Sequence, residues 1–268
     1  MFLWRNGQPL FHFSRYLLAG IFVLLLARQS AAIENITRYK DYQKLTGPPA
    51  QDFLNQGLQY LKEIRGSINY SVHDIDLRLS ILPFATKGLP EKFAATAIND
   101  EGKAVIFLSS KPEDGFPFYG QLGHEIFHLV NPEIMDSYME GLATLFSEKL
   151  MDRLGHNWRW CLEFFKKGGD PFYGQTYFMV RDIEHVVGWK KLLELPEYWR
   201  NVGRQEKQID IDAWMDSLIP AERATVTKII SKYSSSVNEC RKAMKKRYAF
   251  AIPYSYYLTI LPDTIATQ

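Results

Sequence analysis

The chain has 268 residues, of which 46% are hydrophobic and 23% are charged. This ordinary globular composition excludes bulk disorder, a collagen and a coiled coil. There are 32 basic and 30 acidic residues, and three of the basic residues lie in the first 32 positions, where no acidic residue occurs. The other positions are therefore close to neutral, with 29 basic and 30 acidic residues, and we expect no nucleic-acid partner.

The first 32 residues are typical of an export signal. Arg5 and Arg15 precede an uninterrupted apolar stretch at 16–27, and small residues suited to cleavage follow at 30–32. A bilayer span requires about 20 apolar residues, so this stretch is short for a permanent anchor. We expect 1–32 to be the cleaved signal peptide of a secreted or periplasmic protein. The alternative is an uncleaved N-terminal anchor, and only in that case is a membrane expected as a partner.

Patterns in the first half of the remaining chain predict a small β-sheet. Apolar residues at helical spacing predict a helix over 51–64, and alternation of apolar and polar residues predicts a half-buried strand over 75–81. The segments 93–98 and 103–109 flank a turn sequence at 99–102, so we expect them to pair as a hairpin.

Beyond Gly120 the sequence changes to helical spacing. The predicted helices cover 122–130, 137–154, 172–187, 189–195, 211–218 and 221–246. Strands that are followed by helices favour an α+β fold. Because no convincing linker interrupts the chain, we expect residues 33–268 to form one domain, with a small N-terminal β-sheet lobe and a helical C-terminal part.

One motif carries the functional prediction. His124 and His128 are four residues apart, so on a helix they project from one face, where two imidazoles can bind a single tetrahedral zinc. Glu125 lies about 100° round the helix, where its carboxylate can reach a metal-bound water without binding the metal. Apolar residues on the opposite face would anchor this helix in the core. The pattern predicts a catalytic zinc site with Glu125 as general base.

A catalytic zinc requires a third protein ligand and an open fourth position. Glu140 is the candidate, because Pro132 ends the first helix and a second helix packed antiparallel to it would return Glu140 to the histidines. Gly141 and Ala143 would allow the two backbones to approach closely. Glu140 can instead be the capping carboxylate of the pattern Ser137-x-x-Glu140. The other candidates for the third ligand are Glu133, Asp136, Glu148, His156 and His185.

His124-Glu125-x-x-His128 followed by Glu140-Gly141-x-Ala143 resembles the gluzincin branch of zinc metallopeptidases, which uses two histidines and one glutamate as ligands. The resemblance covers about residues 103–195. It implies a zincin-like fold, in which the first of the two helices is the active-site helix. Related folds place a sheet edge beside the cleft, so an extended peptide can pair with the strand over 103–109. The alternative is an interior strand without a free edge.

The resemblance also implies a tyrosine that donates a hydrogen bond to the tetrahedral intermediate. Tyr173 matches that residue by its place after a proline and before a helix, although Thr176 stands where the family usually has a glycine. Tyr177 and His185 are the alternative donors. Thr144 stands where many relatives have an acidic residue, four positions after the ligand glutamate, so the partner of the first histidine is unassigned.

These features predict an exported zinc-dependent hydrolase that holds one Zn²⁺ per chain and cleaves peptide bonds of a peptide or protein substrate. Glu125 would take a proton from the metal-activated water and pass it to the leaving amine. The alternative function is a zinc-bearing binding or scaffold module of the same fold without turnover. Cys161 and Cys240 can form one disulfide or remain two separate thiols.

Overall fold

The computed structural model describes residues 42–66, 68–81, 94–98, 102–134, 136–202 and 207–248, with side chains described as far as 239. These residues belong to one compact unit that begins at Tyr42. The predicted signal segment 1–32 lies outside the described residues, and so does most of the predicted turn at 99–102.

Four strands form one sheet in the order β1-β2-β4-β3. Their bounds are Tyr42–Lys44 for β1, Ile75–Ser80 for β2, Ala95–Ile98 for β3 and Ala104–Leu108 for β4. β3 and β4 pair antiparallel, with Thr96 opposite Ile106, which confirms the predicted hairpin. β2 pairs with β1 antiparallel and with β4 in parallel. β4 is therefore an interior strand, and the expectation of a free edge at 103–109 is wrong; the edge strands of the described sheet are β1 and β3.

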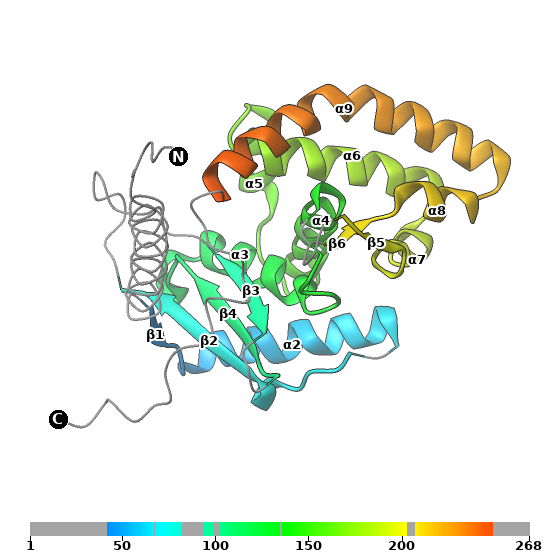
Figure 1. Ribbon diagram of the computed structural model, residues 1–268. Coiled ribbons are helices and arrows are strands. Elements are labelled where there is room, and N and C mark those ends of the chain that lie inside the picture. Colours follow the sequence, from blue (N-terminus) through cyan, green and yellow to red (C-terminus); the bar gives the residue numbers. More distant parts are fainter. Residues whose placement is uncertain are drawn as a thin grey trace, which may run out of the picture. The chain divides into compact units, whose positions relative to one another are not determined.

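Helices pack on this sheet and continue beyond it (Figure 1). The larger ones are α2 (Pro48–Arg65), α3 (Phe116–His128), α4 (Ser137–Arg153), α6 (Pro171–Val187) and α9 (Pro220–Tyr248). The shorter ones are α5 (Arg159–Lys166), α7 (Trp189–Leu192) and α8 (Ile211–Asp216). Single 3₁₀ turns lie at Val72–Asp74, Pro112–Asp114 and Leu195–Glu197. The strands β5 (Trp199–Asn201) and β6 (Lys207–Ile209) pair antiparallel as a separate two-stranded sheet. The chain is a mixed α+β protein with a helical C-terminal part, as predicted.

The sequence patterns missed one helix and three strands. β1, β5 and β6 have three residues each, too few for alternation to be recognised. α5 has apolar side chains on both its faces, because Phe165 is buried whereas the stacked rings of Trp160 and Phe164 are exposed. α5 has only eight residues, fewer than the roughly 11–18 residues over which a helical period is recognised.

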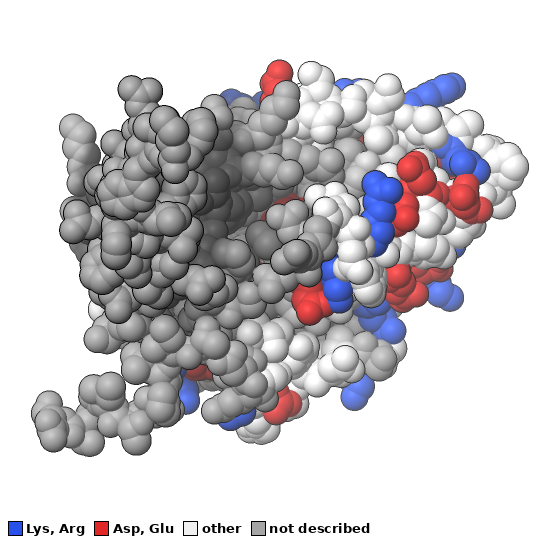
Figure 2. Space-filling view, in the orientation of Figure 1, with Lys and Arg blue, Asp and Glu red and all other residues white. Residues whose placement is uncertain are grey.

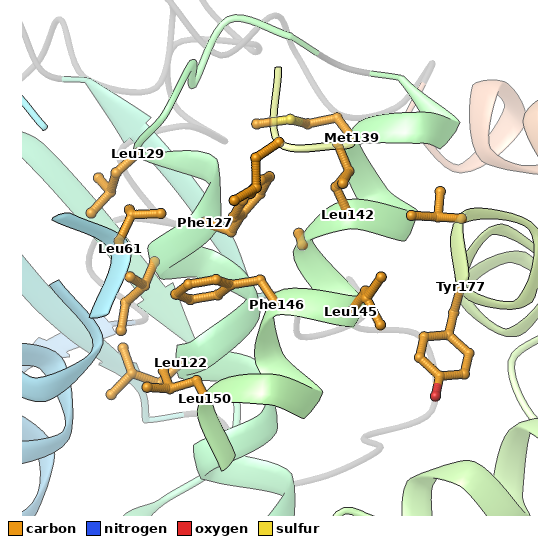
Figure 3. Close-up of a cluster of buried hydrophobic side chains, with 14 of the residues drawn as sticks. Leu61, Leu122, Phe127, Leu129, Met139, Leu142, Leu145, Phe146, Leu150 and Tyr177 are labelled. Atoms are coloured by element: carbon orange, nitrogen blue, oxygen red, sulfur yellow. The ribbon is translucent and has the colours of Figure 1, made fainter. Parts of the chain in front are cut away.

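The core lies between the sheet and helices α2, α3 and α4, and extends to α6 (Figure 3). α4 is buried along most of its length, and Phe146 on it packs against Phe127 of α3 with ring centroids 5.3 Å apart. Full burial of one such side chain contributes about 1.5–3 kcal/mol. α3 and α4 are therefore held in place by apolar packing that does not depend on a bound ion.

The described helices and the described surface can be compared with those of a membrane-spanning or a strongly charged protein. Among the described helices none is long and apolar enough to cross a bilayer. Figure 2 shows basic and acidic side chains interspersed over the described part of the face in view.

Cys161 is a free thiol, and burial together with the charges of Glu148 and Asp170 raises its pKa to about 12. The predicted disulfide alternative is therefore wrong for Cys161, and the side chain of Cys240 lies outside those described.

Candidate metal centre

The two histidines lie in the last two turns of α3, which ends at His128. Leu122 and Ile126 of the same helix are fully buried in the core, whereas the side chains of His124 and His128 keep exposures of 13% and 11%. The helix thus has apolar anchors on one face and partly accessible imidazoles on the other. This is the division that the sequence pattern predicts.

Glu140 lies in the first turn of α4. Another residue caps that helix, so the Glu140 carboxylate is free to contact the histidines. Asp136 is the N-cap residue, and its side chain accepts a hydrogen bond of 2.7 Å from the backbone N–H of Tyr138. The hydroxyl of Ser137 is buried and has no hydrogen-bond partner in the described structure. The predicted capping box between Ser137 and Glu140 is therefore wrong, and Glu140 contacts the histidines instead.

Three side chains from two helices converge on one point. Nε2 of His124 lies 3.0 Å from Oε2 of Glu140 and 3.1 Å from Nε2 of His128, and Nε2 of His128 lies 3.7 Å from the same Oε2. One ligand atom of each residue lies within 4.8 Å of the other two, so the group could hold a metal ion. Two imidazole nitrogens and one carboxylate oxygen are a donor set of catalytic zinc, with the fourth position left for water or substrate.

The ionisable groups of this site are strongly coupled. Burial alone would raise the pKa of Glu140, but the charges and hydrogen bonds of His128 and His124 outweigh it and hold that pKa far below its ordinary value. Burial alone would lower the pKa of His128, but Glu140 and Glu125 reverse this and raise it. Without a metal, the site therefore favours a proton on an imidazole beside an ionised carboxylate. A metal ion held by this group would take the place of that proton.

Thr144 supplies the partner of His124 that the sequence left unassigned. Nδ1 of His124 lies 3.2 Å from the Thr144 hydroxyl, which donates its own proton to the main-chain oxygen of Glu140 at 2.8 Å. Because a hydroxyl has a single proton, Thr144 can only accept from His124. Nδ1 of His124 therefore carries a proton and donates it to this hydroxyl, and Nε2 is the nitrogen that faces Glu140 and His128. The contact with Thr144 thus orients the ring so that Nε2 is the nitrogen available to a metal ion that the group could hold.

Glu125 lies next to this group and is almost completely buried, with an exposure of 4%. Its Oε2 accepts a hydrogen bond of 2.8 Å from the hydroxyl of Thr96 on β3. Burial raises the pKa of Glu125, although the charges of His128 and His124 and the Thr96 hydrogen bond oppose that change. A raised pKa suits a carboxylate that takes up and returns a proton near neutral pH.

The three candidate donors of a hydrogen bond to the tetrahedral intermediate all lie on α6, but they have different surroundings. The ring of Tyr173 lies edge-on to the ring of His124, with centroids 5.4 Å apart. Tyr177 is buried, and its hydroxyl donates a hydrogen bond of 2.9 Å to Glu148. His185 is exposed and lies about 18 Å further along the helix than Tyr173, at 1.5 Å per residue. Of the three, Tyr173 is the one that lies beside the histidines.

The rival candidates for the third ligand have other contacts. Asp136 caps α4, and Glu148 accepts the hydrogen bond from Tyr177. Glu133 is exposed and forms an ion pair on the surface. The ring of His156 stacks on the ring of Tyr119, with centroids 4.1 Å apart. None of these side chains joins the described group of two histidines and Glu140.

Two glycines set the spacing of the helices that carry the site. A Cβ atom on Gly123 of α3 would lie 2.8 Å from Oγ and 3.3 Å from Cα of Ser147 on α4. A Cβ atom on Gly141 of α4 would lie 2.5 Å from the main-chain oxygen of Thr176 on α6. The prediction that Gly141 brings the first two helices together is therefore wrong. Gly123 does this, whereas Gly141 allows α6, with Tyr173, to pack against α4.

Thr96 is the residue of this site that sequence reasoning missed. Its neighbours Ala95 and Ala97 form no functional motif, and the strand pattern alone does not indicate which helix the threonine meets. The pairing of β3 with β4 and the packing of α3 on the sheet bring it to Glu125.

Comparisons of the chain with family models, curated proteins and solved structures find no match in any of the three.

Proposed function

We propose that this protein is a zinc-dependent hydrolase that cleaves peptide bonds, of the gluzincin type and with a zincin-like fold. The observation that carries the proposal is the convergence of His124, His128 and Glu140 beside the buried carboxylate of Glu125. A purely structural zinc site has no use for a base at that position, and four protein ligands are usual there. The motif and its geometry thus support a catalytic site.

The donor set fits zinc. Imidazole and carboxylate ligands together suit Zn²⁺, and three protein ligands leave a position for water or a substrate carbonyl. His124, His128 and Glu140 would hold one ion per chain. When bound, the zinc supplies a water of lowered pKa and polarises the substrate carbonyl. The hydroxyl of Thr144 keeps the ring proton of His124 on Nδ1 and so leaves Nε2 ready to bind.

The remaining steps belong to side chains of the chain itself. Glu125 takes the proton of the attacking water and later delivers it to the leaving amine, and its burial makes the carboxylate a stronger base than a solvated one. Tyr173 lies beside His124 and donates a hydrogen bond to the oxyanion as it forms. Such a donor contributes about 3–4 kcal/mol to transition-state stabilisation in other hydrolases.

The edge of the sheet supports a peptide or protein substrate. β3 is one of the two edge strands of the described sheet, and Thr96 on it touches Glu125. Ala95, Thr96 and Ala97 are buried in the structure, so an extended peptide would pair with this edge, alongside the base, only once the strand is uncovered. The basic and apolar leader at 1–32 supports export of the hydrolase.

The test combines metal analysis with cleavage of an unbiased peptide library, read by mass spectrometry. We expect one tightly bound zinc per wild-type chain and a defined set of cleavage products. Glu125→Gln should keep the zinc and lose at least about 10³-fold in turnover, because an amide cannot accept the proton. Glu113→Gln, the same change at an exposed position, is the matched control and should leave both unchanged.

Two outcomes would contradict the proposal. If Glu125→Gln cleaved every substrate of the wild type at the same rate, the mechanism would be wrong. If the wild type held zinc and cleaved nothing in the library, the alternative of a zinc-bearing binding module would be favoured.

A further inference from the structure

Thr96 and Glu125 join an edge strand to the active-site helix. The hydroxyl of Thr96 lies 2.8 Å from Oε2 of Glu125 and 2.8 Å from the main-chain oxygen of the same residue. Both residues are buried, with exposures of 5% for Thr96 and 4% for Glu125. The contact is therefore shielded from water.

The two acceptors are not equivalent. A threonine hydroxyl has one proton, and a hydrogen bond to an ionised oxygen is roughly twice as strong as one to a neutral oxygen. While Glu125 is ionised, the proton therefore goes mainly to Oε2. No described residue donates a hydrogen bond to the other carboxyl oxygen, Oε1, so the two oxygens of this carboxylate differ in their surroundings.

Thr96 is well placed to impose this difference. A β-branched side chain in a strand has few χ1 rotamers, and β3 is held to β4 by backbone pairing on both sides of Thr96. α3 is anchored by the fully buried Leu122 and Ile126. The hydroxyl and the carboxylate thus come from two rigid elements, which is the arrangement that holds a reacting group in place.

We propose that Thr96 is a positioning residue for Glu125: it holds Oε2, and so leaves Oε1 as the oxygen that accepts and returns the proton. This inference rests on the proposed hydrolase function. The main-chain oxygen of Glu125 lies at the same distance from the Thr96 hydroxyl, so this one hydroxyl contacts both the carboxylate and the backbone of Glu125.

The test compares Thr96→Val, which removes the hydroxyl and keeps the shape, with Thr96→Ser, which keeps the hydroxyl. The variants are assayed as the full chain with zinc, on a peptide cleaved by the wild type. We expect Thr96→Val to lower kcat by about 10-fold to 100-fold with KM within about twofold of the wild type, and Thr96→Ser to recover most of kcat. Zinc affinity, measured by competition with a chelator, should be unchanged in both.

Thr225→Val is the matched control, because Thr225 is exposed and its hydroxyl bonds only the main-chain oxygen of Ala221. If Thr96→Val does not fold, Thr96→Ala removes the same hydroxyl and is read in the same way. An active wild type with an equally active folded Thr96→Val would overturn this inference alone. A wild type without zinc or turnover would overturn the proposed function and this inference with it.

Discussion

The hydroxyl of Thr144 determines which way the ring of His124 is hydrogen-bonded. It accepts from Nδ1 of His124 because its own proton goes to the main-chain oxygen of Glu140. The backbone bond from a threonine to the residue four positions earlier is common in helices. Here that ordinary bond has a consequence, since it orients the lone pair of the hydroxyl toward the histidine.

We predict that Thr144→Val weakens zinc binding by about 10-fold to 100-fold, because His124 loses the partner that fixes its tautomer and ring orientation. Thr144→Ser should bind zinc as the wild type does. The measurement is competition with a chromophoric chelator at fixed pH. Thr227→Val is the control, because Thr227 makes the same backbone bond at an exposed position. Equal zinc affinity of Thr144→Val and wild type would show that the contact has no role in binding.

At the scale of elements, the site depends on how closely α4 approaches its neighbours. α3 contributes the two histidines, α4 contributes Glu140, and α6 contributes Tyr173. Gly123 permits the contact of α3 with α4, and Gly141 permits the contact of α4 with α6. Two positions without a side chain thus determine whether residues on three helices meet.

We predict that Gly141→Ala destabilises the protein by about 1–3 kcal/mol, the usual cost of overpacking. The new methyl group would lie 2.5 Å from a main-chain oxygen of α6, which cannot rotate away as a side chain can. Urea unfolding followed by circular dichroism measures the change. Gly120→Ala on α3 is the control, because its nearest contact is a comfortable 3.6 Å and alanine favours a helix. Equal stability of Gly141→Ala and wild type would mean that the helices can separate without cost.

At the scale of the whole molecule, His128 links protonation and metal binding to folding. In the zinc-free protein its pKa is raised above 6.5, so the folded state binds this proton more tightly than the unfolded state. The resulting stability is fully present below pH 6.5 and is lost as pH rises through the raised pKa. The raised pKa of Glu125 likewise makes the stability of the folded state fall as pH rises, but over a lower pH range. Zinc bound as proposed would act in the opposite direction, because it binds the neutral imidazole and releases the proton.

We therefore predict that the zinc-free protein loses thermal stability between pH 6.5 and 8.5, and that the rise in Tm on adding zinc grows over the same range. Calorimetry with and without a chelator measures both effects. His128→Gln should abolish both, whereas His185→Gln, at an exposed position outside the site, should retain both. A zinc-induced rise in Tm that is larger at pH 6.5 than at pH 8.5 would contradict the prediction.

Much of the fold could be predicted because helices and longer strands have local periods. The buried faces of α2, α3 and β2 follow from the spacing of their apolar residues, and the hairpin of β3 and β4 follows from the turn sequence between them. The three-residue strands and the eight-residue α5 escaped prediction, since segments this short offer too few residues for a period to be recognised.

The sequence by itself determined the placing of His124 and His128 on one face of a helix, with Glu125 beside them, because the 3.6-residue period of a helix is a local property. Only the tertiary structure decided that Tyr173 and not Tyr177 lies beside the histidines, and that Thr96 contacts Glu125. These contacts join elements that are distant in the chain. They depend on the packing of whole helices and strands against one another, which no local pattern of residues specifies.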